Sequence, residues 1–296
     1  MSTDVEYIRK VGAELKNPQY PLKRRFRALF TLKNLKNDES VEMISQCFND
    51  KSALLKHELA YCLGQINLSS AVSTLIRVLE DETQQPVVRH EAAEALGAIG
   101  DKRSIDVLRK YEKSDIPEIA ETCEIALGRL EFLDQGGVID PNVYGTVDPA
   151  PPSDSKDLPN LMEMYLNANL SIFERYRAMF ALRNLNTDFS AEGITKGFNS
   201  KSALFRHEVA FVLGQLQNPV TIPALLKVVE DEGESNMVRH EAIEALGSIG
   251  TPDCVEIIRR FANDSDDLVR ESCLVALDIQ EYNHSSEFQP LDGGDS

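Results

Sequence analysis

Apolar residues recur along this chain at the spacing of amphipathic helices. Over residues 52–66, Leu55, Leu59, Cys62 and Ile66 fall within about 60° of one another at about 100° per residue, so they define one buried stripe. The next such stretch repeats the stripe with Val88, Ala92, Ala95 and Ile99. The pattern predicts a succession of helices that pack through one face.

These helical stretches repeat at about 31–33 residues. Most end in Leu-Gly or a close variant: Leu63-Gly64, Leu96-Gly97, Leu127-Gly128, Leu213-Gly214, Leu246-Gly247 and Ala276-Leu277. Within one unit, Pro86 starts a helix that runs to about Ile99, Gly100 ends it, and a second helix follows near residues 103–112. Two helices per unit at this period predict a helical solenoid, and the unit resembles a HEAT-like repeat.

The chain is an internal duplication. A shift of 150 residues superposes one half on the other, and ranges 81–100 and 231–250 share 13 of 20 residues. We therefore expect an all-α solenoid of eight HEAT-like helical hairpins, in two duplicated halves of four that face each other. The predicted parts are an N-terminal half (1–133), a linker (134–157), a C-terminal half (158–281) and a tail (282–296).

The linker and the tail differ in composition from the repeats. Residues 134–157 carry Gly136-Gly137 and four prolines among scattered aspartates, which is typical of a flexible or polyproline-like linker. The tail is acidic, and we expect it to be disordered. The fifth histidine, His284, lies there without a partner motif.

Composition narrows the class of protein. Of all residues 42% are apolar and 7% aromatic, which suits packed helices, and the net charge of −17 argues against nucleic acid as the main partner. The linker region and the tail carry much of that charge. No secretory signal is visible, and no run approaches the roughly 18 apolar residues of a membrane span. Five cysteines form no CxxC motif, so we expect free buried thiols in a cytoplasmic protein without a membrane association.

Four His-Glu dipeptides are the candidate metal ligands of this chain. They are His57-Glu58, His90-Glu91, His207-Glu208 and His240-Glu241, 33 residues apart within each half and 150 residues apart between the halves. Imidazole and carboxylate are ligands shared by iron, manganese and zinc. Glu58 and Glu91 fall at the border of apolar helical faces, where a carboxylate is costly without a compensating cation. Because neighbouring helix axes pack roughly 8–10 Å apart, each half is predicted to close two His and up to two Glu on one ion.

The flanking repeats lack the motif. At the aligned positions they carry Phe26-Arg27, Tyr176-Arg177, Glu121-Thr122 and Glu271-Ser272. A requirement of the fold would have placed the dipeptide in all eight repeats. The structural alternative is that each His packs or caps and each Glu pairs with an arginine such as Arg27 or Arg177, and four motifs in a doubled register argue against it.

With these motifs placed, the chain resembles deoxyhypusine hydroxylase, a family of HEAT-repeat di-iron monooxygenases, from about residue 20 to 280. The resemblance rests on the duplication and on segments such as Lys56–Gln65 and Val238–Ala242. It implies hydroxylation of the deoxyhypusine side chain on the translation initiation factor 5A precursor. It also implies dioxygen as co-substrate and two Fe ions per chain, as Fe²⁺ or as an oxygen-bridged di-iron pair.

The resemblance also implies roles for the eight motif residues. The four histidines ligate iron, with Glu91 and Glu241 as the expected carboxylate ligands. Glu58 and Glu208 either ligate metal as well or act in catalysis by binding the substrate's polyamine cations. We favour the second role as a hypothesis, because three ligands per ion leave one acid spare in each half.

Two other classes of function stay open on the residues alone. A plain HEAT scaffold would bind a partner through its concave face and keep the His-Glu pairs as structure. A dimetal hydrolase, or a bilin lyase built on similar repeats, would use the same scaffold without oxygen chemistry. A scaffold predicts no stoichiometric iron, and a hydrolase favours zinc or manganese.

Overall fold

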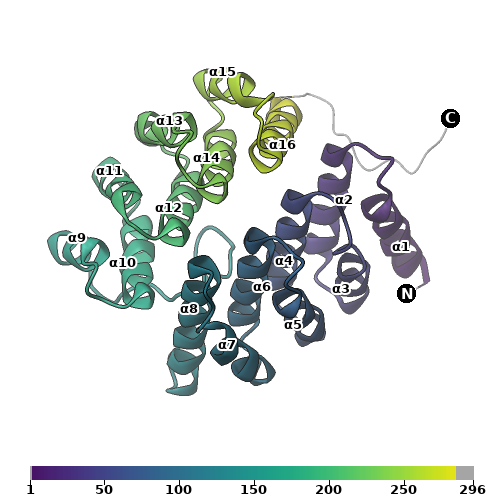
Figure 1. Ribbon diagram of the computed structural model, residues 1–296, viewed down its shortest axis with the longest axis horizontal. Helices are drawn as coiled ribbons and strands as arrows, with labels where there is room; N and C mark the ends of the chain where they lie inside the picture. Colours follow the sequence, from purple (N-terminus) through teal and green to yellow (C-terminus); the bar gives the residue numbers. More distant parts are fainter. Residues whose placement is uncertain (1, 285–296) are drawn as a thin grey trace.

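The chain folds as a ring of paired helices. In the computed structural model, which describes residues 2–284, sixteen α-helices form eight hairpins (Figure 1). The first helices of the hairpins lie outside: α1 (Ser2–Lys16), α3 (Asp38–Ser45), α5 (Val72–Glu80), α7 (Ile105–Tyr111), α9 (Leu158–Leu166), α11 (Asp188–Thr195), α13 (Ile222–Glu230) and α15 (Pro252–Phe261). The second helices lie inside: α2 (Leu22–Leu35), α4 (Ala53–Ile66), α6 (Pro86–Ile99), α8 (Pro117–Asp134), α10 (Ile172–Leu185), α12 (Ala203–Leu216), α14 (Asn236–Ile249) and α16 (Asp267–His284). Short 3-10 turns precede α5 (Ser69–Ala71), α7 (Lys102–Ser104), α12 (Lys196–Asn199) and α13 (Pro219–Thr221).

This architecture confirms the predicted fold class. The inner helices α2 to α8 form one arc and α10 to α16 form a second arc that faces it (Figure 1). The predicted stripe on α4 is buried, with Leu55, Leu59 and Cys62 fully buried, but the buried surface is wider than predicted, because most other residues of this helix are buried too. The predicted tail began at residue 282, but α16 continues to His284, so residues 282–284 are helical. The rest of the predicted tail, residues 285–296, lies outside the described residues.

Local sequence fixes where the inner helices begin and end. Pro86 occupies the first turn of α6, and Gly100 ends the helix with φ +73°, in the left-handed region that glycine adopts without strain. The α4 helix begins after Ser52, whose hydroxyl accepts the backbone N–H of Leu55. These signals repeat in the second half at Gly250 and Ser202, so both arcs present their inner helices at the same level.

Glycines bring the inner helices unusually close together. A Cβ atom built on Gly97 of α6 would lie 2.7 Å from the Cβ of Ala126 on α8 and 2.9 Å from its Cα. Gly247 of α14 stands in the same relation to Ala276 of α16, at 2.8 Å from its Cβ. The Leu-Gly signature that marks the repeats therefore marks the contact points between neighbouring inner helices.

We expect Gly97→Ala to lower the free energy of unfolding by about 1–3 kcal/mol, because the added methyl group meets the backbone of α8. Chemical denaturation measures the loss. Gly233→Ala, in an exposed turn, is the matched control and should stay within about 0.5 kcal/mol of the wild type. Equal stability of the two variants would contradict the tight helix contact.

The two arcs meet at two seams that repeat each other. At one seam Ser52 Oγ donates to Glu271 Oε2 over 2.6 Å, and at the other Ser202 Oγ donates to Glu121 Oε2 over 2.5 Å. Thus Glu121 and Glu271, which stand where the motif is missing, tie one half to the other. The seam between α2 and α16, which no linker crosses, also contains a bidentate ion pair between Arg27 and Asp278, at 2.8 and 2.9 Å.

The segment between the halves is non-helical from residue 135 to 157, close to the predicted linker range. Parts of it pack against both arcs, since Asp148 and Ala150 are buried. Its predicted flexibility stays a prediction.

The five cysteines are buried and unpaired, as expected. Within residues 2–284, no helix has the length and apolar character needed to cross a membrane.

Candidate metal centre

The four His-Glu dipeptides lie at one level of the inner layer. They belong to α4, α6, α12 and α14, and each histidine is the fifth residue of its helix. Their side chains are buried: the four histidines are at most 4% exposed. Equal placement on equivalent helices brings residues from distant parts of the sequence to the centre of the ring.

The four imidazoles form one cluster. The ring centroid of His57 lies 5.6 Å from that of His90, 5.9 Å from that of His207 and 5.2 Å from that of His240. His207 lies 5.3 Å from His90 and 5.4 Å from His240. The cluster therefore joins both halves, and the predicted convergence of the motifs is present.

Carboxylates complete the cluster within each half. Glu91 Oε2 lies 3.3 Å from His57 Nε2, and Glu241 Oε2 lies 3.3 Å from His207 Nε2. Groups of side chains close enough to hold one ion are His57–His90–Glu91, His57–His207–His240 and His240–Glu241–Glu244. Among the residues that the structure describes, neither Glu58 nor Glu208 belongs to such a group. Glu58 Oε1 lies 3.3 Å from His57 Nδ1.

The imidazoles leave their nitrogens without hydrogen-bond partners. Both ring nitrogens of His57, His90 and His207 and the Nε2 atom of His240 are buried and make no hydrogen bond, and neither does Glu208 Oε1. Buried polar atoms of this kind carry a desolvation cost unless something binds them. Seven unsatisfied imidazole nitrogens beside carboxylates fit metal ions of the borderline class.

The protonation states of the histidines fit the same role. Burial lowers the pKa of His90 and of His207 well below the usual value, and neighbouring imidazoles add to the effect. The pKa of His240 is lowered in the same way. For His57, burial also acts downward, but Glu91 and Glu58 outweigh it and raise its pKa well above the usual value. Three neutral imidazoles are in the form that binds a metal.

Burial of the acids around the cluster outweighs the nearby positive charges. Burial raises the pKa of Glu208 and of Glu241 well above the usual value, with neighbouring glutamates contributing. Burial likewise raises the pKa of Glu58, against a lowering contribution from His57. Cations at the centre would stabilise the ionised carboxylates, and this is the compensation that the sequence predicted for Glu58 and Glu91.

Two further acids were missed by the sequence argument. Glu94 and Glu244 follow Glu91 and Glu241 by three residues, 150 residues apart, so they lie one helical turn along the same face. Glu244 Oε1 lies 3.4 Å from His240 Nδ1 and accepts a hydrogen bond from Ser272 Oγ over 3.0 Å. The repeated spacing H-E-x-x-E was the signal that could have found them.

A cavity of about 500 Å³ opens beside the cluster. Six glutamates line it, and Lys33 is the one lysine or arginine among the lining residues. Aromatic walls are supplied by Phe26, Phe30, Tyr61, Tyr144 and Phe211. An apolar, strongly acidic cavity suits a ligand with an aliphatic body and cationic groups.

Comparisons with known proteins agree on one family. A family model described as HEAT repeats matches residues 41–128 and 191–278. The deoxyhypusine hydroxylase of Drosophila melanogaster is 53% identical over 290 residues, which cover 97% of this chain and 96% of that protein. The deoxyhypusine hydroxylase of Homo sapiens is 48% identical, with 99% of this chain and 97% of that protein covered.

A solved structure is similar over nearly the whole chain. The structure of human deoxyhypusine hydroxylase in complex with glycerol superposes with a TM-score of 0.93 at 48% identity. The superposition covers 95% of this chain and 98% of that chain.

Proposed function

Because the chain belongs to the deoxyhypusine hydroxylase family, it is an enzyme that hydroxylates deoxyhypusine, and we propose that it does so with two iron ions bound at the His-Glu cluster. The observation that carries the proposal is the set of buried imidazole nitrogens without partners, facing carboxylates at the junction of the halves. The substrate group is the deoxyhypusine side chain of the translation initiation factor 5A precursor, and dioxygen is the co-substrate.

We assign one ion to each half. His57, His90 and Glu91 would hold the first, and the grouping of these three side chains supports it. His207, His240 and Glu241 would hold the second, supported by the 3.3 Å approach of Glu241 to His207. Two histidines and one carboxylate per ion leave coordination positions open, the arrangement of non-haem iron sites that react with oxygen. Iron, when bound, would supply the redox chemistry that activates dioxygen, so that one oxygen atom is inserted into a C–H bond and the other leaves as water, with two electrons and two protons from an external reductant.

Glu58 and Glu208 are proposed to bind the substrate. Deoxyhypusine is a lysine extended by an aminobutyl group, so it carries two amines that are cationic at neutral pH. Both acids line the cavity and neither belongs to a group of side chains that could hold one ion, and the Oε1 atom of Glu208 is buried without a hydrogen-bond partner. An ammonium group would satisfy this oxygen and the charge of the carboxylate.

The cavity walls would place the carbon chain. Tyr61 and Phe211 lie three residues after Glu58 and Glu208, and their ring centroids are 6.1 Å apart. Together with Phe26 and Phe30 they form an apolar surface against which methylene groups pack. These walls would also limit the access of water to the reacting carbon.

Metal analysis tests the proposal most directly. Protein purified without added metal is expected to contain about two iron ions per chain, since ligands for two ions are present. It is also expected to show a visible absorption band and to add one oxygen atom to a peptide that carries aminobutyl-lysine, measured by mass spectrometry. Stoichiometric zinc without iron, or iron-free protein that still hydroxylates, would contradict the iron assignment.

Membership of an enzyme family decides against the plain scaffold and the hydrolase. The cytoplasmic location and the absence of a nucleic-acid partner stay proposals. Five unpaired cysteines support a reducing compartment, and the net charge of −17 supports a basic or cationic partner.

A further inference from the structure

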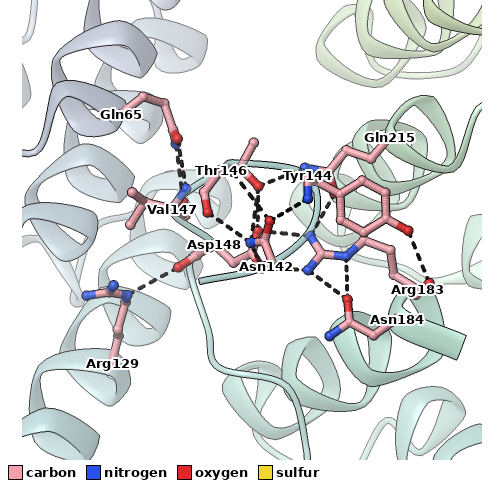
Figure 2. A network of polar contacts seen from close by, with 10 residues as sticks. All are labelled: Gln65, Arg129, Asn142, Tyr144, Thr146, Val147, Asp148, Arg183, Asn184 and Gln215. Carbon is pink, nitrogen blue, oxygen red and sulfur yellow. Dashed lines mark hydrogen bonds and ion pairs between the residues drawn. The ribbon is translucent and has the colours of Figure 1, made fainter. Parts of the chain in front are cut away.

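The linker between the halves is fixed to both arcs by a buried polar network (Figure 2). Asp148 forms a bidentate pair with Arg183 of α10, at 2.7 and 2.9 Å, and the Arg183 side chain is fully buried. Asn142 donates to the same carboxylate over 2.8 Å. The Arg183 guanidinium lies over the ring of Tyr144, with its Cζ atom 4.5 Å from the ring centroid. Charge-assisted bidentate pairs of this kind hold a fixed geometry.

Two equivalent glutamines clamp the linker from opposite sides. Gln65 of α4 exchanges two hydrogen bonds with the backbone of Val147, at 2.8 and 3.2 Å. Gln215 of α12, 150 residues later, donates to Thr146 Oγ1 over 3.1 Å. Arg129 of α8 donates to the Asp148 carbonyl over 3.2 Å and to the Gly97 carbonyl of α6 over 2.9 Å. The linker therefore contacts side chains in the last turns of α4, α10 and α12, and Arg129 of α8 (Figure 2).

The equivalent ends of α2 in the first half and of α12, α14 and α16 in the second half line the cavity. On this side the lining residues near the helix ends are Lys33, Gln215, Gln217, Ser248 and Ile279. Their counterparts 150 residues away are Arg183, Gln65, Asn67, Ala98 and Arg129, and none of these lines the cavity. The burial differs accordingly, since Ser248 is exposed whereas Ala98 is 4% exposed.

We propose that the linker closes one of two entrances that the duplication would otherwise leave equivalent, and that the substrate side chain enters over the ends of α12, α14 and α16. This inference rests on the proposed function, because it assigns the route of the aminobutyl-lysine group to the same site. It makes the linker a wall of the cavity, with Tyr144 and Thr146 on its surface.

The charge of the open entrance fits this substrate. Carbonyl groups at the C-terminal ends of helices carry partial negative charge, and the ends of α12 and α14 meet at this side of the cavity. The covered side presents two guanidinium groups to the linker, Arg129 and Arg183, whereas the equivalent positions of the open side hold one cationic residue, Lys33, and the apolar Ile279. The two amines of the aminobutyl-lysine side chain are not equivalent, whereas the ligand sets of the two halves are nearly so. A single entrance therefore fixes which amine lies next to which half.

Paired cysteine variants test the route without measuring turnover. Ser248→Cys and Ala98→Cys occupy equivalent positions, and the five native thiols are buried. We expect a maleimide to label Ser248→Cys at least about tenfold faster than Ala98→Cys in the folded protein. A peptide with aminobutyl-lysine should slow labelling of Ser248→Cys, whereas the same peptide with plain lysine should not. Equal labelling rates, or no protection by the modified peptide, would overturn the proposal.

A charge at the entrance gives a second, independent measurement. Ile279 and Leu274 are exposed apolar residues of α16, at 41% and 49%, and only Ile279 lines the cavity. Ile279→Arg should raise the dissociation constant of a fluorescent aminobutyl-lysine peptide about tenfold with metal content unchanged, because like charges oppose entry. Leu274→Arg should bind as the wild type does. Wild-type affinity in Ile279→Arg would sink the assigned route, whereas failure of the wild type to bind or hydroxylate the peptide would instead count against the proposed function.

Discussion

His207→Ala is expected to remove one of the two metal ions and to reduce hydroxylation by at least about 100-fold. His207 is buried at the centre of the cluster, 5.3 Å from His90 and 5.4 Å from His240 by ring centroids, and it contacts Glu241 at 3.3 Å. Removal of its imidazole leaves the ligand set of the second half with two members. Elemental analysis should give about one ion per chain, and the visible band should be lost.

The control for this variant is His284→Ala, chosen because the fifth histidine has no following glutamate in the sequence. We expect it to keep the metal content and the activity of the wild type. If His207→Ala retained two ions per chain and full activity, the histidines would be structural and the metal assignment would be wrong.

Glu58→Gln and Glu208→Gln are expected to separate substrate binding from metal binding. Each substitution keeps the size of the side chain and removes the charge that would face an ammonium group. Loss of one partner of a buried charge pair costs about 2–5 kcal/mol, so affinity for an aminobutyl-lysine peptide should fall roughly 30-fold or more. Iron should stay near two per chain.

Glu91→Gln and Glu241→Gln are the matched comparison, since they make the same change in the other His-Glu dipeptide of each half. They are expected to lose metal, because Glu91 and Glu241 belong to the groups of side chains close enough to hold one ion, whereas Glu58 and Glu208 do not. Iron loss in Glu58→Gln or Glu208→Gln would refute the division of roles and would place these acids among the ligands.

Much of this arrangement was predictable because the sequence repeats at two periods. The 31–33-residue unit predicted the hairpins, and the 150-residue shift predicted two facing halves. A fixed position on equivalent helices was enough to bring His57, His90, His207 and His240 together. In a solenoid each repeat packs on its neighbour in the same way, so residues at the same position of successive repeats lie at equivalent places in the structure.

The parts that break the repetition could not be predicted in this way. Glu94 and Glu244 repeat in sequence, but only the contacts of Glu244 with His240 and Ser272 show that it acts on the cluster. The linker has no counterpart, so no comparison between halves predicts that Asp148 pairs with Arg183. A composition of Gly, Pro and Asp indicates a non-helical segment and does not show what that segment covers.

The seams between the arcs carry a record of how such a chain arose. The Ser52–Glu271 and Ser202–Glu121 contacts are one contact made twice, which is the signature of an isologous interface in a two-fold homodimer. Fusion of two copies makes that interface intramolecular. The two halves can then differ in sequence, because each is encoded separately. Tyr61 opposite Phe211, and Thr122 in place of Ser272, are differences that a homodimer of identical subunits could not hold.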